Sequence, residues 1–362
     1  MKRGVHWSAV VFKCLIATVI FVEVFSFLVV ITSNYWIYGQ LRDGERVHYD
    51  PYILFQTDGY PRPTHHNPPM PEPGKTKILW LFGGSTMAGV TDYDDRTIPS
   101  FLAASLNEEK PLVPAYLTNY GEPSFNSLME TKYLEKVLIE NPIRPDIIIF
   151  YDGANDCTYF AQTREPEGGH LGYSKVKGLI ESYQRSFFGL FKPLNAAIYA
   201  SFSKELYEKI RQGVLPIAAD SPDLQRFVDV AEKRYDFVNE TAAKRGVKFL
   251  LIWQPTWWAE TDQIAPSVKR KEDKNIVIGR FFALRHNFTV INNALVARLK
   301  NKPYFIDFQN ILCPRTEPTY QDDGIHLEDG GRKMVAQRMS RLLKERFFTS
   351  QGDLQGNDNR IP

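Results

Sequence analysis

Cysteine is scarce in this sequence, which contains only three, Cys14, Cys157 and Cys313, among 362 residues. No CxxC pair and no Cys/His cluster has the spacing of metal ligands, so the sequence predicts no metal site, and it implies no cofactor. Neither sign of charge is in excess, because 44 basic residues balance 42 acidic ones. Nucleic-acid binding usually requires a strongly basic face, so this class of partner is disfavoured.

A bias toward disorder is absent as well. Hydrophobic residues make up 43% and charged residues 24% of the chain. These fractions are close to the averages for globular proteins, so most of the chain is expected to fold around a sizeable core.

A long apolar run is present at the amino terminus, from Ala9 to Thr32. Its length matches the roughly 20 residues that a helix needs to cross a bilayer. Lys2 and Arg3 precede it, which favours a cytoplasmic amino terminus and a periplasmic or cell-surface location for the rest of the chain. Tyr35 and Trp36 follow it, as in an aromatic belt at the membrane interface. We expect residues 1–35 to form a cytoplasmic tip and an uncleaved single-pass signal anchor.

Two features complicate this anchor. Lys13 lies near the cytoplasmic end and can extend to the headgroups, whereas Glu23 lies deep in the run. Glu23 is compatible with a partner helix, with protonation, or with an imperfect anchor. A cleaved secretory signal is the main alternative, but the run is longer than a typical signal core and no clean A-x-A site follows.

The rest of the chain divides by composition. Residues 36–74 are polar and rich in proline, which predicts an extended linker or strap. Residues 75–349 alternate short apolar runs with amphipathic stretches, the pattern of βαβ units. An insertion at about 158–221 is longer than one crossover helix and is predicted to be a lid. Residues 350–362 read as a flexible tail.

Five apolar runs predict the strands of one parallel sheet, and several lack alternation, as expected for strands covered on both faces. We therefore expect an α/β fold, a three-layer α/β/α domain with about five parallel strands in a flavodoxin-like order, preceded by one transmembrane helix. The runs are 78–82, 115–119, 146–151, 247–253 and 304–308, and helical spacing appears at 127–140, 224–245, 290–299 and 331–347.

Polar residues follow the ends of three of these strands, at the edge where sites form in open α/β sheets. Ser85 follows Gly83-Gly84 after the first strand, although Gly-Gly-Ser-Thr is also compatible with an ordinary helix N-cap. Asn155 follows the third strand, where its amide can donate to an oxyanion or the segment can be a plain turn. Gly121 follows the second strand, where its N–H can closely approach a substrate.

A fourth group lies beyond the last strand. Asp323 precedes His326 by three residues, a spacing that lets the acid bend back and hold the imidazole. Asp322 is the second candidate for this orienting role.

Taken in order, these blocks resemble the SGNH hydrolases, also called GDSL esterases and lipases. Gly84-Ser85 fits the first block, Gly121 the second, Gly153-Ala154-Asn155-Asp156 the third and Asp323-Gly324-Ile325-His326 the fourth. Gly84 stands where the family name has aspartate, as in membrane-linked bacterial relatives, and this leaves the substrate class open.

The resemblance implies an ester hydrolase in which Ser85 is the nucleophile, His326 the general base and then acid, and Asp323 the orienting acid. It implies an oxyanion hole made by the N–H groups of Ser85 and Gly121 and by the Asn155 amide. An O-acyltransferase acting on cell-surface polysaccharide would use the same triad, and a non-catalytic, membrane-tethered assembly subunit is the alternative outside enzymology.

The interpretations of the substrate and of a possible disulfide are based on fewer residues. Trp257 and Trp258 follow the fourth strand and are compatible with stacking on a sugar ring or with core packing. Together with the extracytoplasmic location, they suggest an acylated carbohydrate or similar ester as substrate. Cys157 and Cys313 are both expected in loops at the active-site edge, where they either pair as a disulfide or stay free. The sequence indicates no particular protein partner.

Overall fold

The computed structural model describes residues 2–38, 47–69, 74–89, 93–108, 111, 113–169, 173–185, 192–199, 201–261, 265–276 and 284–348. The predicted tail, 350–362, lies outside these residues. The chain forms two compact units, Met1–Glu45 with Leu171–Pro216, and Arg46–His170 with Ile217–Pro362. Here they are called the anchor unit and the sheet unit. The domain boundaries expected from the sequence stay predictions.

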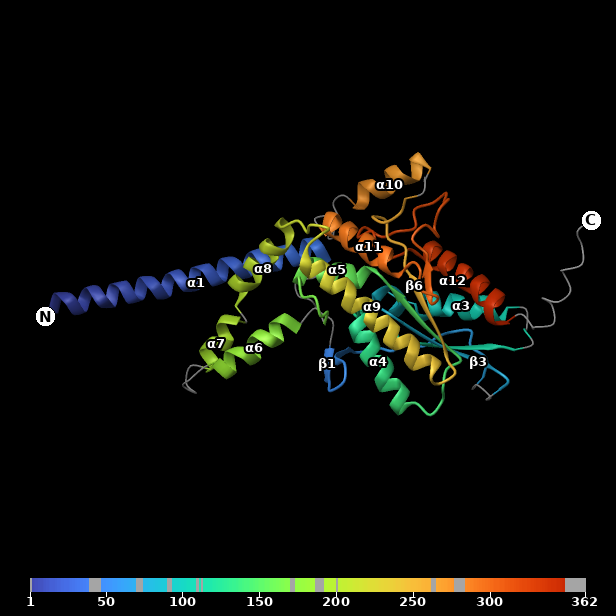
Figure 1. The fold of residues 1–362 in the computed structure, drawn as a ribbon. Helices are drawn as coiled ribbons and strands as arrows, with labels where there is room; N and C mark the ends of the chain where they lie inside the picture. Colours follow the sequence, from blue (N-terminus) through green and yellow to red (C-terminus); the bar gives the residue numbers. More distant parts are fainter. Residues whose placement is uncertain are drawn as a thin grey trace, which may run out of the picture. The chain divides into compact units, whose positions relative to one another are not determined.

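The sheet unit is built on five parallel strands in the order β4-β3-β5-β6-β7 (Figure 1). This order is flavodoxin-like, and the predicted fold class is confirmed. The strands are β3 (Lys77–Gly83), β4 (Ala115–Asn119), β5 (Ile147–Asp152), β6 (Lys248–Trp253) and β7 (Phe305–Asp307).

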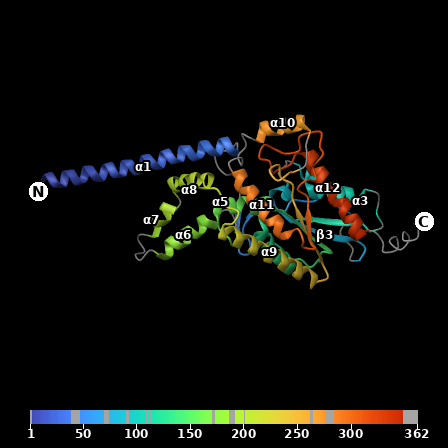
Figure 2. The ribbon, with the colours of Figure 1, turned by 45° about the horizontal axis from the view of Figure 1, so that its top comes forward.

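The three central strands, β3, β5 and β6, are buried on both faces because helices cover both faces of the sheet. In β3, Trp80 and Phe82 face one hydrophobic core, and Leu79 and Leu81 face the other. Figure 1 and Figure 2 show the sheet between its helical layers. The first core includes side chains of α4 (Ser127–Glu140), α5 (Ala154–Thr163), α9 (Pro222–Ala243) and α11 (Arg285–Leu299), and the second those of α3 (Ile98–Asn107) and α12 (Asp329–Leu343).

The described part of the proline-rich segment, residues 47–69, belongs to the sheet unit. It begins with a hairpin of β1 (Val47–Asp50) and β2 (Leu54–Thr57), whose Ile53 is fully buried. Farther along, Asn67 exchanges two hydrogen bonds with the backbone of Leu117 in β4, at 2.8 and 2.9 Å.

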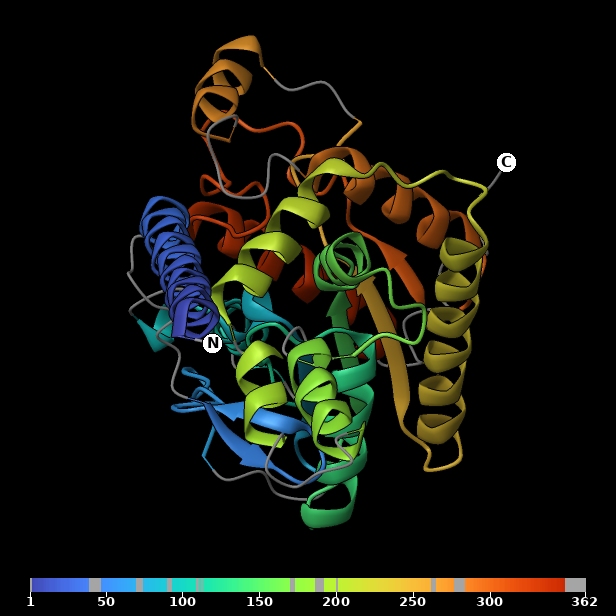
Figure 3. The ribbon, with the colours of Figure 1, turned by 90° about the vertical axis from the view of Figure 1, so that its left-hand side faces the viewer.

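The anchor unit contains α1 (Lys2–Tyr38), α6 (Tyr173–Arg185), α7 (Lys192–Tyr199) and α8 (Phe202–Val214). Within α1, Val10–Ser33 is long and apolar enough to cross a bilayer by length and composition, with a mean hydropathy of 2.8. Within this unit α8 lies beside α1 and α6 lies beside α7 (Figure 3). The predicted insertion is therefore shared between units, since its first part, α5, belongs to the sheet unit.

Candidate active site

Ser85 lies at the carboxyl edge of the sheet, where β3 turns into the short helix α2 (Ser85–Ala88). Two glycines make this turn possible. A Cβ on Gly83 would lie 2.6 Å from the Met87 Cβ, and one on Gly84 would lie 1.8 Å from the Asn155 Nδ2. A side chain at position 84 would therefore displace the Asn155 amide, which explains glycine immediately before the serine.

Ser85, His326 and Asp323 form one continuous hydrogen-bonded chain. The Ser85 Oγ lies 2.7 Å from the His326 Nε2, and the His326 Nδ1 lies 2.5 Å from the Asp323 Oδ2. Because a carboxylate only accepts, the Nδ1 carries the proton and the Nε2 is left to accept from the serine hydroxyl. This is the geometry that activates a serine nucleophile.

The Asp323 carboxylate is fully buried yet held in its charged form. Its Oδ1 accepts hydrogen bonds from the N–H groups of Ile325 and His326, both at 2.8 Å. Burial acts to raise its pKa, but the hydrogen bond and charge of His326 with these two N–H groups outweigh it, and the pKa of Asp323 falls to about 2. Asp322 is exposed, so the geometry favours Asp323 as the orienting acid.

Two of the three expected oxyanion donors are in position. The Ser85 N–H opens the first turn of α2, where backbone N–H groups have no intrahelical acceptor. The Asn155 Nδ2 donates to the Phe125 carbonyl at 2.5 Å. An amide nitrogen carries two hydrogens, so one remains available to a substrate oxygen.

Gly121 departs from its expected role. Its N–H donates to the Asn119 Oδ1 at 2.9 Å and is therefore occupied. A Cβ on Gly121 would lie 2.3 Å from the Ala88 nitrogen. The glycine thus permits close packing of this loop against α2, and the structure does not present it as an oxyanion donor.

Ser124 has an unusual backbone conformation beside this site. It lies in the loop whose Phe125 carbonyl holds Asn155, and its φ of 64° is in the left-handed region. Its N–H has no acceptor among the residues that the structure describes. A non-glycine residue at positive φ has no sequence signature, which is why the pattern did not reveal it.

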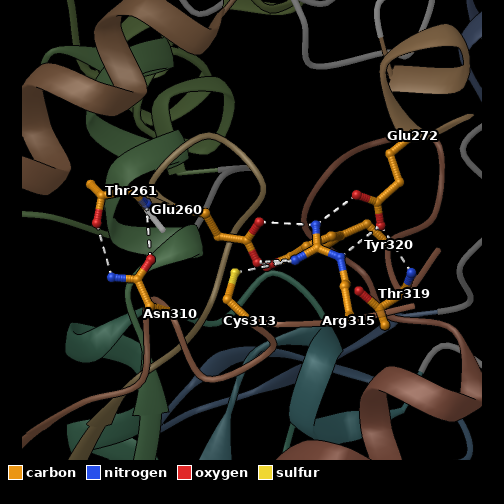
Figure 4. A network of polar contacts seen from close by, with 8 residues as sticks. All are labelled: Glu260, Thr261, Glu272, Asn310, Cys313, Arg315, Thr319 and Tyr320. Carbon is orange, nitrogen blue, oxygen red and sulfur yellow. Dashed lines mark hydrogen bonds and ion pairs between the residues drawn. The ribbon is translucent and has the colours of Figure 1, made fainter. Parts of the chain in front are cut away.

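A buried Arg315 network fixes the loop that carries Asp323 and His326 (Figure 4). The guanidinium, 1% exposed, makes paired hydrogen bonds with the carboxylates of Glu260, at 2.8 and 2.9 Å, and Glu272, at 2.6 and 3.2 Å. The Tyr320 hydroxyl donates to Glu260, and the Thr319 N–H donates to Glu272.

The network joins distant parts of the sheet unit. Glu272 belongs to α10 (Pro266–Ile276), and Glu260 follows β6. Thr319 and Tyr320 directly precede the catalytic loop, whose ends are joined by a bond from the Gln321 N–H to the His326 carbonyl at 2.9 Å. No motif surrounds Arg315 in the sequence, and only the fold brings its partners together.

Trp257 and Trp258 pack beneath this loop. The backbone N–H of Trp257 donates to the Gly324 carbonyl at 2.9 Å. The Trp258 ring contacts the Phe288 ring edge-on, with centroids 5.1 Å apart. Both indoles are partly buried. Their contacts favour the packing interpretation over an open sugar platform. A small crevice beside His326 is lined instead by Thr86, Ile98, Leu327 and Arg332.

Cys157 and Cys313 form no disulfide bond with each other in the structure. Cys157 is fully buried in the core on the α4, α5 and α9 face of the sheet, whereas the Cys313 Sγ lies 3.6 Å from the Arg315 Nη1. Burial and the nearby Asp156 charge raise the pKa of Cys157 well above its usual value. A buried neutral thiol of this kind is unreactive.

No family model matches the chain, and no curated relative matches it. Several solved structures are similar in fold. An acetyl xylan esterase is 16% identical with a TM-score of 0.42, over 74% of this chain and 99% of its own. A carbohydrate acetylesterase from Sinorhizobium meliloti is 14% identical with a TM-score of 0.39, over 75% and 100%.

A G-D-S-L family lipolytic protein from Desulfitobacterium hafniense is 11% identical with a TM-score of 0.40, over 74% of this chain and 100% of its own. The strand order is the one expected for the SGNH hydrolase fold, and Ser85, His326 and Asp323 meet at the carboxyl edge of the sheet.

Proposed function

We propose that this chain is a serine esterase of the SGNH type that acts through an acyl-serine intermediate. The observation that supports it is the connected Ser85–His326–Asp323 chain, with the Ser85 Oγ 2.7 Å from the His326 Nε2. Two distant parts of the sequence, Ser85 and the Asp323/His326 pair, converge in the hydrogen-bonded arrangement that nucleophilic catalysis requires.

In the first step the Ser85 Oγ attacks the ester carbonyl carbon, and its proton moves to the His326 Nε2. The carbonyl oxygen becomes an oxyanion, stabilised by the Ser85 N–H and the free Asn155 N–H. Asp323, ionised because its pKa is about 2, stabilises the imidazolium.

In the second step the imidazolium returns its proton to the leaving alcohol, and the acyl group stays on Ser85. Water then attacks the acyl-serine while the His326 Nε2 accepts its proton. Collapse of the second tetrahedral intermediate releases the acid and restores the Ser85 hydroxyl. A sugar hydroxyl in place of water would give acyl transfer instead.

The decisive test is labelling of the detergent-solubilised full chain with a fluorophosphonate probe. We expect wild type and the control Ser105→Ala, on α3, to be labelled and Ser85→Ala not to be. Labelling of Ser85→Ala at the wild-type level would exclude Ser85 as the nucleophile. A folded wild type that takes no label would favour a non-catalytic, membrane-tethered subunit.

The substrate that we propose is a short-chain ester of a carbohydrate outside the cytoplasm. The apolar span of α1 suits an enzyme held at a membrane. The catalytic domain would then be periplasmic or at the cell surface.

Hydrolysis and transfer are separated by their products. Incubating the enzyme with an acetyl ester and an oligosaccharide acceptor should give free acetate and no acylated acceptor. Acylated oligosaccharide that disappears in Ser85→Ala would identify the chain as an O-acyltransferase.

A further inference from the structure

The anchor unit contains a carboxylate that is bound by the start of another helix. Glu23 lies near the middle of the apolar span Val10–Ser33 of α1. Its Oε1 accepts from the Phe202 N–H at 2.5 Å, and its Oε2 accepts from the Ser203 Oγ at 3.0 Å and the Ser203 N–H at 3.4 Å. Phe202 and Ser203 are the first two residues of α8.

These bonds satisfy the open amino end of α8. The first N–H groups of a helix have no intrahelical acceptor, and leaving them unpaired in an apolar medium is costly. The Glu23 carboxylate accepts hydrogen bonds from the N–H groups of Phe202 and Ser203. The Ser201 Oγ accepts one from the Lys204 N–H at 3.3 Å. The carboxylate also lies where the helix dipole favours negative charge. The amino end of α8 is therefore capped jointly by Glu23 of α1 and by Ser201.

The residues of α1 that contact α8 lie on one face of the helix. Glu23, Ser26, Phe27 and Val30 are partly or fully covered, at the spacing of one helix face. The Phe27 and Phe202 rings meet edge-on with centroids 5.0 Å apart. On the uncovered side of α1, apolar residues such as Phe21 are exposed.

The helices of the insertion carry exposed apolar residues of their own. In α7, Leu194, Ala197 and Ile198 are exposed at positions that share one face. In α8, Tyr207 and Ile210 are exposed three residues apart. Exposed apolar surface that continues from a membrane span is the surface that acyl chains cover.

The position of Glu23 in α1 determines how deep the amino end of α8 would lie in the bilayer. Glu23 precedes Ser33 by ten residues, which is about 15 Å along a helix. If Val10–Ser33 spans a hydrocarbon layer of about 30 Å, the start of α8 lies inside it. A water-exposed α8 would instead require Glu23 to leave the bilayer, and the remaining apolar stretch of α1 would be too short to cross it.

We propose that the anchor unit is a membrane-embedded module, in which α8 enters the bilayer beside α1 and the apolar faces of α7 and α8 contact the acyl chains of the leaflet at the carboxyl end of the span. The insertion predicted as a lid then has a membrane-binding role. Glu23 is the residue that makes entry possible, because it pairs with the amino end of α8. This inference does not depend on catalysis.

The test places a fluorescent label on single cysteines in the full chain, reconstituted into phosphatidylcholine vesicles. The background is Cys14→Ser with Cys313→Ser, and the fully buried Cys157 is retained. Labels go on Ile198→Cys and Ile210→Cys, with Lys244→Cys, exposed on the sheet unit, as the control. We expect acyl-brominated lipid to quench the first two and aqueous iodide to quench only the control.

Iodide quenching at 198 and 210 as strong as at 244 would overturn the proposal, because those faces would then be exposed to water. A second variant tests Glu23 itself. In Glu23→Leu, we expect the 210 label to gain access to iodide while a label on Val19→Cys of α1 stays in lipid. Glu23→Gln, whose amide oxygen still accepts a hydrogen bond, should retain the wild-type pattern. An unchanged 210 label in Glu23→Leu would exclude the role of Glu23.

Discussion

At the scale of single residues, the two neighbouring aspartates of the catalytic loop differ in what surrounds them. Asp323 is buried and bonded to His326, whereas Asp322 is exposed. We expect Asp323→Asn to lower kcat by about 10³- to 10⁴-fold, because an amide cannot stabilise the imidazolium. Asp322→Asn should retain near wild-type turnover. Initial rates with a short-chain p-nitrophenyl ester measure both, and a larger loss in Asp322→Asn would reverse the assignment.

The second prediction concerns Asn155 as a donor to the oxyanion. Asn155→Ala removes one oxyanion donor, so we expect kcat to fall about 10²- to 10³-fold with little change in KM. Asn293→Ala, at an exposed position on α11, is the matched control. Steady-state kinetics of both variants at equal melting temperature test this. A rise in KM with unchanged kcat would show that Asn155 binds the ground state instead.

The sequence revealed the residues that stand at strand ends and little else of the site. Ser85, Asn155 and His326 were found because the carboxyl ends of parallel strands share one edge. Gly121 was identified from the sequence as an oxyanion donor, but in the structure its N–H donates to the Asn119 side chain. Hydrogen bonds of this kind depend on backbone placement within a few tenths of an ångström, which spacing cannot supply.

At the scale of elements, the Arg315 network fixes the catalytic loop, and its removal should be costly. Arg315→Met leaves the carboxylates of Glu260 and Glu272, at most 2% exposed, without their cation. We expect the free energy of unfolding to fall by about 3–5 kcal/mol. Arg298 offers a matched control, because it also pairs with two acids, Asp229 and Glu232, but is 37% exposed. Arg298→Met should cost about 1 kcal/mol or less.

A compensating variant tests whether the stability lost in Arg315→Met comes from unpaired buried charges or from lost hydrogen bonds. If unpaired buried charge causes the loss, replacing both acids by glutamine in the Arg315→Met background should recover part of the stability. Urea unfolding in detergent measures all three proteins. A triple variant less stable than Arg315→Met would show that the hydrogen bonds, and not the unpaired charges, carry the effect.

Elements with strong patterns were predicted closely. The predicted strand at 115–119 and helix at 127–140 match β4 and α4 residue for residue. The β1–β2 hairpin was missed because it is short and lies in a polar, proline-rich segment. Arg315 was missed for a related reason, since its partners lie 43 and 55 residues away in the sequence.

At the scale of the whole molecule, the sequence indicated the segments but not their grouping. The insertion was predicted to be a lid, yet α6 to α8 form one compact unit with α1, from which more than a hundred residues separate them. The signal was Glu23, a carboxylate in an apolar run that was compatible with a partner helix. Which helix it meets is a tertiary contact, and no periodicity contains it.

The sheet unit also encloses an acidic cluster that joins its layers. Glu130 of α4, Asp152 at the end of β5 and Asp156 of α5 are all buried, and Arg234 of α9 is the cation that lies among them. The Tyr235 hydroxyl donates to the Asp152 Oδ2 at 2.8 Å, and the Ser127 Oγ donates to the Asp156 Oδ1 at 2.6 Å. With three acids near one guanidinium, burial and the Asp156 charge raise the pKa of Asp152 to about 7.

This raised pKa predicts how the stability of the sheet unit depends on pH. An acid whose folded pKa lies above its unfolded value binds more protons when folded, so stability falls as pH rises from about 4 toward 7. Asp152→Asn cannot titrate and should escape this fall. We expect wild type to lose on the order of 2 kcal/mol more than Asp152→Asn between pH 5 and pH 8.

Urea unfolding at the two pH values measures this difference, and comparing variants cancels the other titrating groups. Glu240→Gln, at an exposed position on α9, should show the wild-type dependence. If Asp152→Asn also follows the wild-type curve, the proton that the cluster takes up resides on another of its carboxyls. Repeating the comparison with Glu130→Gln would then locate it, because the pKa of Glu130 is raised by burial and by the Asp152 charge. Protonation of this buried cluster thus links α4, β5 and α5 to the pH of the surroundings.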